Sequence, residues 1–321
     1  MKVIIATVII ALLPVLIELS LRRRFLVHET GVVVISGCSS GIGLDAAMHL
    51  AKLGYTVFAG VRTQNDADLL KSAFNSPHLI PTIFDVTKPE QLESLVTSVE
   101  EYLSQSKLAL AAVINNAGIG HRAPFESTDL KDARRVYDVN LFGAMDLTQH
   151  FIPLLRHHKG RVIFVSSIAG LASIAGSSIY ASSKRAIEGF IDSLRLEMAW
   201  FDVPVISVLP GYITTKIVNH NEDNSQLVGP DQYELYKGFW INDNNKMRKV
   251  LSKAANPDVA SQVIIEALTS PYPLVRYPVG PVDGILSAKV IASIVGILPD
   301  RVADRLKFTS NHVPNQEGGS R

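Results

Sequence analysis

The chain has 321 residues, of which 47% are hydrophobic and 19% are charged, and its formal net charge at pH 7 is +1. This length allows one large α/β domain with extensions as well as two small domains. The near-zero charge, with no long basic run beyond residues 22–24, excludes nucleic acid as an expected partner.

The first 27 residues are interpreted as a membrane anchor. Residues 3–21 are almost uninterrupted apolar sequence, close to the ~20 residues that cross a bilayer as a helix, and three arginines follow. A cleaved signal peptide would have a shorter apolar centre and a small-residue cleavage site, so an uncleaved transmembrane helix is favoured. A helix lying in the interface is the alternative, because Pro14 and Glu18 interrupt the segment. The arginines favour a cytosolic position for the domain that follows.

Short apolar runs alternate with amphipathic stretches from Gly31 onward, which is typical of βαβ units and a parallel sheet. We expect this domain to span residues 28–281. Strands are expected at residues 32–36, 56–61, 79–84, 110–115, 161–166, 204–209 and 274–277. Helices are expected at residues 42–53, 89–103, 129–150, 178–200 and 257–268.

A glycine-rich turn separates the first expected strand from the first expected helix. Glycines there let the backbone approach a pyrophosphate, which amide groups and the positive end of the helix dipole then hold. The spacing is Gly-x-x-x-Gly-x-Gly, which differs from the general dinucleotide fingerprint. The residues that we expect to contact the cofactor here are Gly37, Ser39, Ser40, Gly41, Ile42 and Gly43. Cys38, the only cysteine, is interpreted as a small loop filler rather than a nucleophile.

The end of the second expected strand indicates which nicotinamide nucleotide binds. A carboxylate there would accept hydrogen bonds from a ribose 2′-hydroxyl, whereas an arginine would hold a 2′-phosphate. This chain has Arg62 and no carboxylate at that point. Arg62, helped by the hydroxyl of Ser40, therefore favours NADP(H) over NAD(H). The alternative is a solvated arginine at the end of a strand.

Tyr180 and Lys184 lie four positions apart, on one face of an expected helix. An ammonium group one turn from a phenol favours the phenolate, so this spacing predicts a lowered tyrosine pKa and a proton-transfer role. An isolated Tyr–Lys pair is more often a solvated helix face. Three further polar clusters end expected strands, at residues 115–118, 166–167 and 210–211, and open α/β sheets bind ligands at these carboxyl ends.

The C-terminal third contains two segments of uncertain role. Residues 212–256 are polar, with aromatic side chains at Tyr233, Tyr236, Phe239 and Trp240, and form either a cover over a pocket or an ordinary surface excursion. Residues 282–321 are expected to be an extension. Its apolar stretch, residues 284–298, predicts a helix packed on the core or lying on a membrane surface, and residues 310–321 are expected to fray.

The motifs together resemble the short-chain dehydrogenase/reductase family over about residues 30 to 280. The resemblance implies a Rossmann-type doubly wound parallel sheet of about seven strands in the order 3-2-1-4-5-6-7. It implies that Ser167 holds the substrate oxygen and that Tyr180 exchanges a proton with it. Lys184 would lower the pKa of Tyr180 and bind the nicotinamide ribose, and Asn140 would position a water molecule. The other implied cofactor contacts are Asp85, Val86, Asn116, Ala117, Gly118, Pro210, Gly211 and Thr215. No metal site is implied.

The apolar N-terminus, the extended C-terminal part and residues 192–197 look like the membrane-associated branch that includes steroid and retinol dehydrogenases. This implies an endoplasmic reticulum membrane, a homodimer or homotetramer, and hydride transfer between NADP(H) and a hydrophobic alcohol, ketone or aldehyde, such as a steroid, a retinoid or a lipid-derived carbonyl. Two alternatives stay open. One is a catalytically idle NADP(H)-binding sensor or scaffold, and the other is a soluble, broad-specificity carbonyl reductase with an N-terminal targeting signal.

Overall fold

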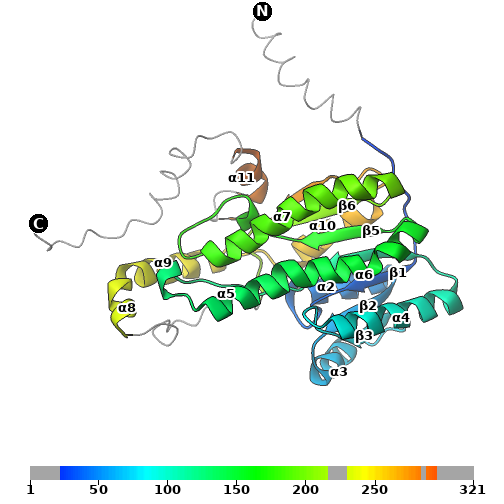
Figure 1. Ribbon diagram of the computed structural model, residues 1–321, viewed down its shortest axis with the longest axis horizontal. Coiled ribbons are helices and arrows are strands. Elements are labelled where there is room, and N and C mark those ends of the chain that lie inside the picture. The colour runs from blue at the N-terminus through cyan, green and yellow to red at the C-terminus, as the bar shows by residue number, and fades with distance from the viewer. Residues whose placement is uncertain (1–21, 216–229, 283–286, 295–321) are drawn as a thin grey trace, which may run out of the picture.

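The computed structural model describes residues 22–215, 230–282 and 287–294. A seven-stranded parallel sheet with the order β3-β2-β1-β4-β5-β6-β7 forms its centre (Figure 1). The strands are β1 (Val32–Ile35), β2 (Thr56–Val61), β3 (Leu79–Ile83), β4 (Leu110–Asn115), β5 (Arg161–Val165), β6 (Val205–Pro210) and β7 (Arg276–Val279). The predicted strand order is therefore confirmed, and each strand lies within two residues of its expected position.

Helices cover both faces of the sheet, as the doubly wound fold requires. Apolar side chains on one face pack against α2 (Gly41–Lys52), α3 (Gln64–Ala73) and α10 (Pro257–Thr269). The other face packs against α4 (Pro89–Ser106), α6 (Gly143–His158) and α7 (Ser178–Met198). Strand β1 contributes to both cores, because Val33 and Ile35 belong to the first and Val32 and Val34 to the second. A strand buried on both faces reads as a continuous apolar run.

Two helical regions differ from the predictions. Helix α3 was not expected, because its sequence is polar and it buries only Ala67 and Leu70. Its start is marked by Thr63, whose side chain accepts a hydrogen bond from the amide of Asp66 and so caps the helix. The single helix expected at 129–150 is instead α5 (Leu130–Tyr137), a π-helical turn (Asp138–Phe142) and α6, which continues to His158.

The polar segment at 212–256 is partly helical. It contains α8 (Pro230–Leu235) and α9 (Lys237–Leu251), while residues 216–229 lie outside the described residues. Helix α9 buries Trp240, Asp243, Met247 and Val250, at spacings of three and four that place them on one face. The charged Asp243 interrupts this apolar stripe, which is why the sequence pattern did not reveal the helix.

The predicted membrane helix, residues 3–21, lies outside the described residues, as does the tail from residue 295. Within the three described stretches, no helix has the length and apolar character that crossing a bilayer requires. In the predicted 284–298 helix, the structure describes α11 (Ala288–Ile294), which buries Ala288. The boundaries of the anchor and of the C-terminal extension stay predictions.

Candidate active site

A cavity of about 570 Å³ opens at the carboxyl ends of the strands, around the point where β1 and β4 lie side by side and the strand order reverses. Open α/β sheets bind ligands at this switch point, and the volume lies within the usual range for ligand pockets. Almost all the predicted site residues line it: Gly37, Ser39, Ser40, Gly41, Ile42, Arg62, Asp85, Val86, Asn116, Ala117, Gly118, Ser167, Tyr180, Lys184, Pro210, Gly211 and Thr215. Gly43 and Asn140 lie directly behind this lining.

The glycine-rich turn has no room for side chains. A Cβ atom on Gly41, where φ is +62°, would lie 2.8 Å from Cγ2 of Thr215. A Cβ atom on Gly43 would lie 2.3 Å from Nδ2 of Asn116 and 2.4 Å from the carbonyl oxygen of Gly37. The backbone at the start of α2 therefore borders the cavity directly, which fits the close approach of a pyrophosphate.

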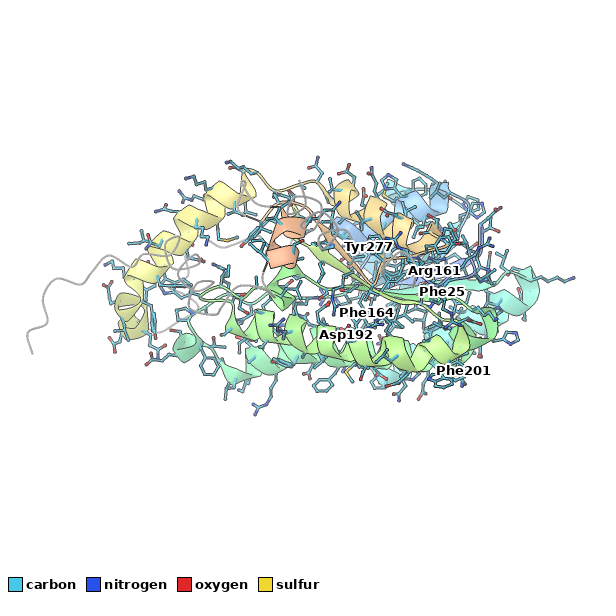
Figure 2. The ribbon with its side chains drawn as sticks, turned by 90° about the horizontal axis from the view of Figure 1, so that it is seen from above. Phe25, Arg161, Phe164, Asp192, Phe201 and Tyr277 are labelled. Atoms are coloured by element: carbon cyan, nitrogen blue, oxygen red, sulfur yellow. The ribbon has the colours of Figure 1, made fainter. Side chains whose placement is uncertain are left out.

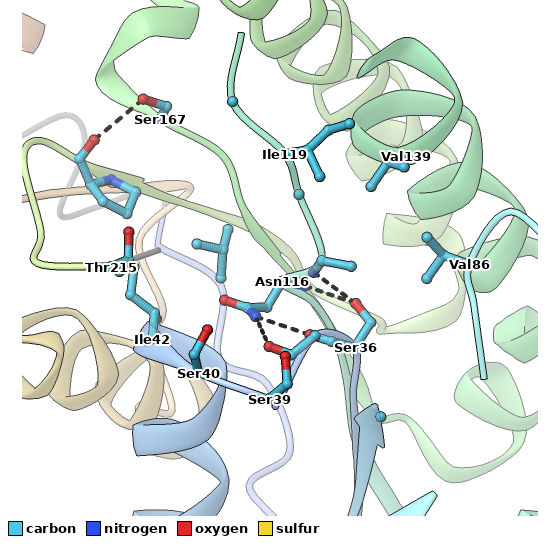
Figure 3. Close-up of a pocket in the computed structure, with 18 of the residues that line it drawn as sticks. Ser36, Ser39, Ser40, Ile42, Val86, Asn116, Ile119, Val139, Ser167 and Thr215 are labelled. Carbon is cyan, nitrogen blue, oxygen red and sulfur yellow. Dashed lines mark hydrogen bonds between the residues drawn. The ribbon is translucent and has the colours of Figure 1, made fainter. Parts of the chain in front are cut away.

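The start of α2 also has the right charge for a phosphate. The amide groups of a first helical turn have no partner within the helix, and the helix dipole places positive potential there. This turn contains no acidic residue, and the side chain of Ser40, the N-cap residue, makes no capping hydrogen bond. Figure 3 shows Ser39, Ser40 and Thr215 on one side of the cavity and Val86 and Val139 on the other.

Asn116 fastens the glycine-rich turn to the end of β4. Its Nδ2 donates to the carbonyl oxygens of Ser36, at 2.9 Å, and Gly37, at 3.0 Å (Figure 3). The hydroxyl of Ser36 in turn accepts hydrogen bonds from the amides of Asn116 and Ala117, both at 3.0 Å. The amide side chain of Asn116 thus shapes the cofactor end of the cavity through the backbone. No motif in the sequence points to Ser36.

Arg62 and two carboxylates line the end of the cavity beyond β2. Arg62 is exposed, and no hydrogen bond or ion pair joins its guanidinium to another described residue. The carboxylate of Asp85 already accepts two hydrogen bonds from Thr87, whose amide and hydroxyl donate to Oδ1 at 2.9 and 2.8 Å. Asp66 accepts a hydrogen bond from the hydroxyl of Thr63 at 2.7 Å. Arg62 is therefore the cationic group available for an anionic ligand at this end.

Ser167, Tyr180 and Lys184 come together at the other end of the cavity. Nζ of Lys184 lies 5.9 Å from the centre of the Tyr180 ring and donates to the carbonyl oxygen of Val165 at 3.1 Å. The hydroxyl of Ser167 accepts from the amide of Ala169 at 3.1 Å. The predicted grouping of these three side chains is therefore what the structure has, although the side chain of Lys184 is directed to a backbone carbonyl.

The pKa of Tyr180 shifts in the direction opposite to the predicted one. Burial raises this pKa above its ordinary value of 10.0, a hydrogen bond with Ser167 opposes the shift, and Tyr212 adds to it. Lys184 does not reverse the effect. Burial lowers the pKa of Lys184 itself to about 8, although Glu188 acts against that lowering. At neutral pH the Tyr180 hydroxyl therefore keeps its proton and can act as a proton donor.

Asn140 lies in the π-helical turn, a feature that is frequent at functional sites. Its Oδ1 accepts from the amide of Ile119 at 2.8 Å, and its Nδ2 donates to the carbonyl of Ile119 and to the hydroxyl of Ser183. A Cβ atom on Gly118 would lie 3.4 Å from Oδ1 of Asn140 and 3.7 Å from Nζ of Lys184. The missing side chain at Gly118 thus leaves space between the two groups.

A charge network around the buried Glu188, behind Lys184, was not predicted from the sequence. Glu188, one helical turn after Lys184, accepts from the hydroxyl of Ser207 at 2.6 Å and from Nε of Arg276 at 2.8 Å. Arg276 also donates to Asp192 at 2.7 Å. These residues come from α7, β6 and β7, so their contact depends on the tertiary fold. The i, i+4 spacing of Lys184 and Glu188 was the available signal.

A second buried ion pair joins α9 to the loop after β4. Nε of Arg122 donates to Oδ2 of Asp243 at 2.6 Å, and Nη2 bonds to Oδ1 of the same carboxylate. The pKa of Arg122 is raised by Asp243 despite its burial, so the pair stays ionised. The charges of Arg122 and Asp243 both affect the pKa of Tyr212. No local pattern reveals a partner 121 positions away, and this contact fixes α9 beside the Tyr180 end of the cavity.

Cys38 is buried within the glycine-rich turn, and burial raises the pKa of its thiol. Its Sγ lies 3.4 Å from the carbonyl oxygen of Ile35. A protonated, inaccessible thiol is a poor nucleophile, which supports its interpretation as a loop filler.

Comparisons with known proteins agree with this geometry. The family model of the short chain dehydrogenases matches residues 31–226. Retinol dehydrogenase 16 of Rattus norvegicus is 33% identical over 311 residues, which cover 94% of this chain and 95% of the rat protein. Estradiol 17-beta-dehydrogenase 2 of the same organism is 33% identical over 236 residues, covering 71% of this chain and 61% of that protein.

The fold is also similar to solved structures. A short chain dehydrogenase from Burkholderia cenocepacia, crystallised in complex with NADP, superposes with a TM-score of 0.67 and is 24% identical. The superposition covers 88% of this chain and 99% of the bacterial one. At this identity the likeness shows the fold alone.

Proposed function

The chain belongs to the short chain dehydrogenase family, and from this premise we propose that it is an NADP(H)-dependent oxidoreductase that interconverts hydrophobic alcohols and their ketones or aldehydes. The observation that carries the proposal is the grouping of Ser167, Tyr180 and Lys184 at one end of a cavity whose other end is bordered by the glycine-rich turn. A proton donor and a phosphate-binding turn in one cavity suit hydride transfer from a dinucleotide.

The residues present fit a nicotinamide dinucleotide. The start of α2 and the glycines before it would hold the pyrophosphate, and Arg62 would face the adenosine ribose. Asn116 would support that turn rather than bind the nucleotide with its side-chain amide, since both of its amide hydrogens are used within the protein. Lys184 would face the nicotinamide ribose.

The nicotinamide would supply or accept the hydride. Tyr180 would donate its proton to the carbonyl oxygen as negative charge develops there, and Ser167 would hold that oxygen by a hydrogen bond. The ammonium of Lys184 would stabilise the phenolate that remains after the proton leaves. Because burial raises the pKa of Tyr180, its hydroxyl is protonated at neutral pH, which is the form that donates a proton during carbonyl reduction.

Apolar side chains in the cavity lining support the proposed substrate class. Ile119, Val139 and Ile213 line the cavity, and the buried Arg122–Asp243 pair places α9 beside it. The other described charged groups at the cavity, apart from Lys184, lie at the Arg62 end. An apolar substrate suits such walls. The names of similar proteins, a retinol dehydrogenase and an estradiol dehydrogenase, support retinoids and steroids as the first compounds to test.

A turnover assay tests the proposal. The purified full chain is incubated with NADPH or NADP⁺ and a panel of retinoids, steroids and long-chain carbonyls, with charged keto acids, and for NADP⁺ charged hydroxy acids, as matched polar controls. We expect oxidation of NADPH with apolar carbonyls and none with the polar controls. Binding of NADPH without turnover of any compound would instead indicate a sensor or scaffold, and faster turnover of the polar controls would contradict the substrate class.

The preference for NADP(H) is tested by Arg62→Ala. Loss of a charged hydrogen bond of about 1.5–3 kcal/mol to the 2′-phosphate should raise the KM for NADPH roughly ten- to hundredfold. The KM for NADH should stay nearly constant, because NADH has no phosphate at that position. Arg135→Ala, which removes an exposed arginine outside the cavity, is the control. An unchanged KM for NADPH in Arg62→Ala would remove Arg62 from the site.

Membrane association is the last part of the proposal. The apolar run at residues 3–21 and the arginines at 22–24 support an N-terminal anchor in the endoplasmic reticulum membrane, with the domain in the cytosol. A bilayer would also concentrate an apolar substrate near the enzyme. The homodimer or homotetramer stays a prediction.

A further inference from the structure

The N-terminal strap, residues 22–28, is bound firmly to the domain although it has no regular secondary structure. The amide of Phe25 donates to the carbonyl of Pro271 at 2.9 Å, and the buried Arg161 donates to the carbonyl of Leu26 at 2.9 Å. The hydroxyl of Tyr55 donates to the carbonyl of His28. Because these contacts fix the strap, the point where the apolar residues 3–21 join the domain has a defined position.

Large apolar side chains are exposed beside the strap, at the end of α7. Trp200 is 87% exposed, Leu196 is 61% exposed and Phe201 is 43% exposed. Nη1 of Arg23 donates to the carbonyl of Ala199 at 2.7 Å, which places the strap against the same turn. Figure 2 shows Phe25 and Phe201 in the right-hand half of the molecule. Such a cluster is unusual on a surface that contacts only water.

Basic groups surround these apolar side chains. The strap contributes Arg22, Arg23 and Arg24, and the end of α6 contributes Arg156 and Lys159. The guanidinium of Arg156 lies over the Phe201 ring, 5.0 Å from its centre.

Two acidic side chains, Glu197 and Asp202, lie among these groups. Asp202 is paired with both Arg23 and Lys159, whose charges lower its pKa, so it stays ionised and its charge is balanced. The net charge of this surface is positive. We call the surface formed by residues 22–24, Arg156, Lys159, Leu196, Trp200 and Phe201 the Trp200 face.

We propose that the Trp200 face lies against the anionic headgroups of a lipid bilayer, with Trp200 inserted at the boundary of the acyl chains. Exposed tryptophan beside arginine and lysine is the composition of membrane interfaces, where anionic lipids attract the basic groups. Residue 22, the first described residue after the apolar sequence 3–21, belongs to this face, so a bilayer that holds that sequence would meet the face. The contact goes beyond the proposed anchor, because it fixes how the domain is oriented on the membrane.

The orientation has a consequence for the active site. The Trp200 face lies at the amino ends of β5 and β6, whereas the cavity opens at the carboxyl ends of the strands. A bilayer on the Trp200 face would therefore leave the cavity uncovered. Variants of Trp200 should keep the turnover of a dissolved substrate, which separates this inference from the proposed function.

The fluorescence of the full chain tests the inference, because the chain has only two tryptophans. Trp240 is 1% exposed, so a contact with lipid changes mainly the signal of Trp200. The probe is a vesicle of phosphatidylcholine and phosphatidylserine with brominated acyl chains. We expect about twofold quenching of the emission and loss of its quenching by acrylamide, since interfacial side chains lie about 5–10 Å into the headgroup and acyl boundary. Trp200→Phe should remove both effects.

A charge-reversal variant of the basic residues supplies a second test of the inference. Arg156→Glu combined with Lys159→Glu should at least halve the quenching by brominated lipid, while the share of protein bound to vesicles through residues 3–21 stays the same. The proposal would be overturned if acrylamide still quenched the tryptophan emission of vesicle-bound protein and brominated lipid did not. Protection of Trp200 that grows with protein concentration in the absence of lipid would also overturn it, because a second copy of the chain would then cover the face.

Discussion

Tyr180→Phe should lower kcat by at least about 10²–10⁴-fold, the contribution that a positioned acid–base group makes. The substitution removes the oxygen that would exchange a proton with the substrate and keeps the ring that packs beside Lys184. Because the start of α2 and Arg62 would carry most of the nucleotide binding, the dissociation constant of NADPH should stay nearly constant. Initial rates together with nucleotide binding measured by fluorescence titration check both parts.

Tyr102→Phe is the matched control for this variant. Tyr102 lies on α4, where its hydroxyl pairs with Thr56 at 3.2 Å, and it does not line the cavity. Tyr102→Phe also loses a phenolic oxygen, and the kcat of this variant should be unchanged. Turnover by Tyr180→Phe at the rate of the unmodified enzyme would exclude the phenol as the proton donor, whatever the substrate is.

Lys184→Met should make the protein more stable while abolishing turnover. Lys184 is 5% exposed, and burial lowers its pKa from 10.5 to about 8. This shift corresponds to about 3 kcal/mol of lost stability below pH 8. Methionine has a similar shape without the charge, although it also loses the hydrogen bond to Val165, worth about 1 kcal/mol. At pH 7 the melting temperature should rise by roughly 2–6 °C.

The pH dependence distinguishes this cause from better packing. The pKa of Lys184 is lower in the folded chain than in the unfolded one, so between about pH 8 and 10.5 the unfolded chain binds more protons. The stability of the unmodified protein should therefore rise with pH over this interval, and the advantage of Lys184→Met should shrink. A variant that melts below the unmodified protein at pH 7, or an advantage that does not change with pH, would contradict the assigned cause.

The fold was predictable because its signals are local. Buried strands are mostly continuous apolar runs, as in residues 32–35, and the glycine-rich turn needs close backbone approach that a side chain would block. Helices α3 and α9 escaped detection because their buried faces are narrow or contain a charge. Asp243 breaks the apolar stripe of α9, and its partner Arg122 comes from a distant loop.

The candidate site was predictable in its membership and less so in its electrostatics. Motif spacing identified Ser167, Tyr180 and Lys184, which the fold brings to one cavity. The direction of the Tyr180 pKa depends on how deeply both groups are buried and on where the lysine side chain points. The spacing of four residues between Tyr180 and Lys184 determines neither the burial of the two groups nor the direction of the lysine side chain. A short sequence motif specifies a helix face, whereas the free energy of a charge depends on everything around it.

Transfer of isotope from the cofactor tests the central claim most directly. The purified enzyme is given NADPH deuterated on one face of the nicotinamide C4 atom and an apolar ketone that it reduces, and the product alcohol is analysed by mass spectrometry. We expect deuterium at the carbinol carbon from one of the two labelled faces only, because a cavity bordered by Tyr180 and Lys184 holds the ring in one orientation. Product alcohol that carries no deuterium from either labelled form would contradict hydride transfer in this cavity.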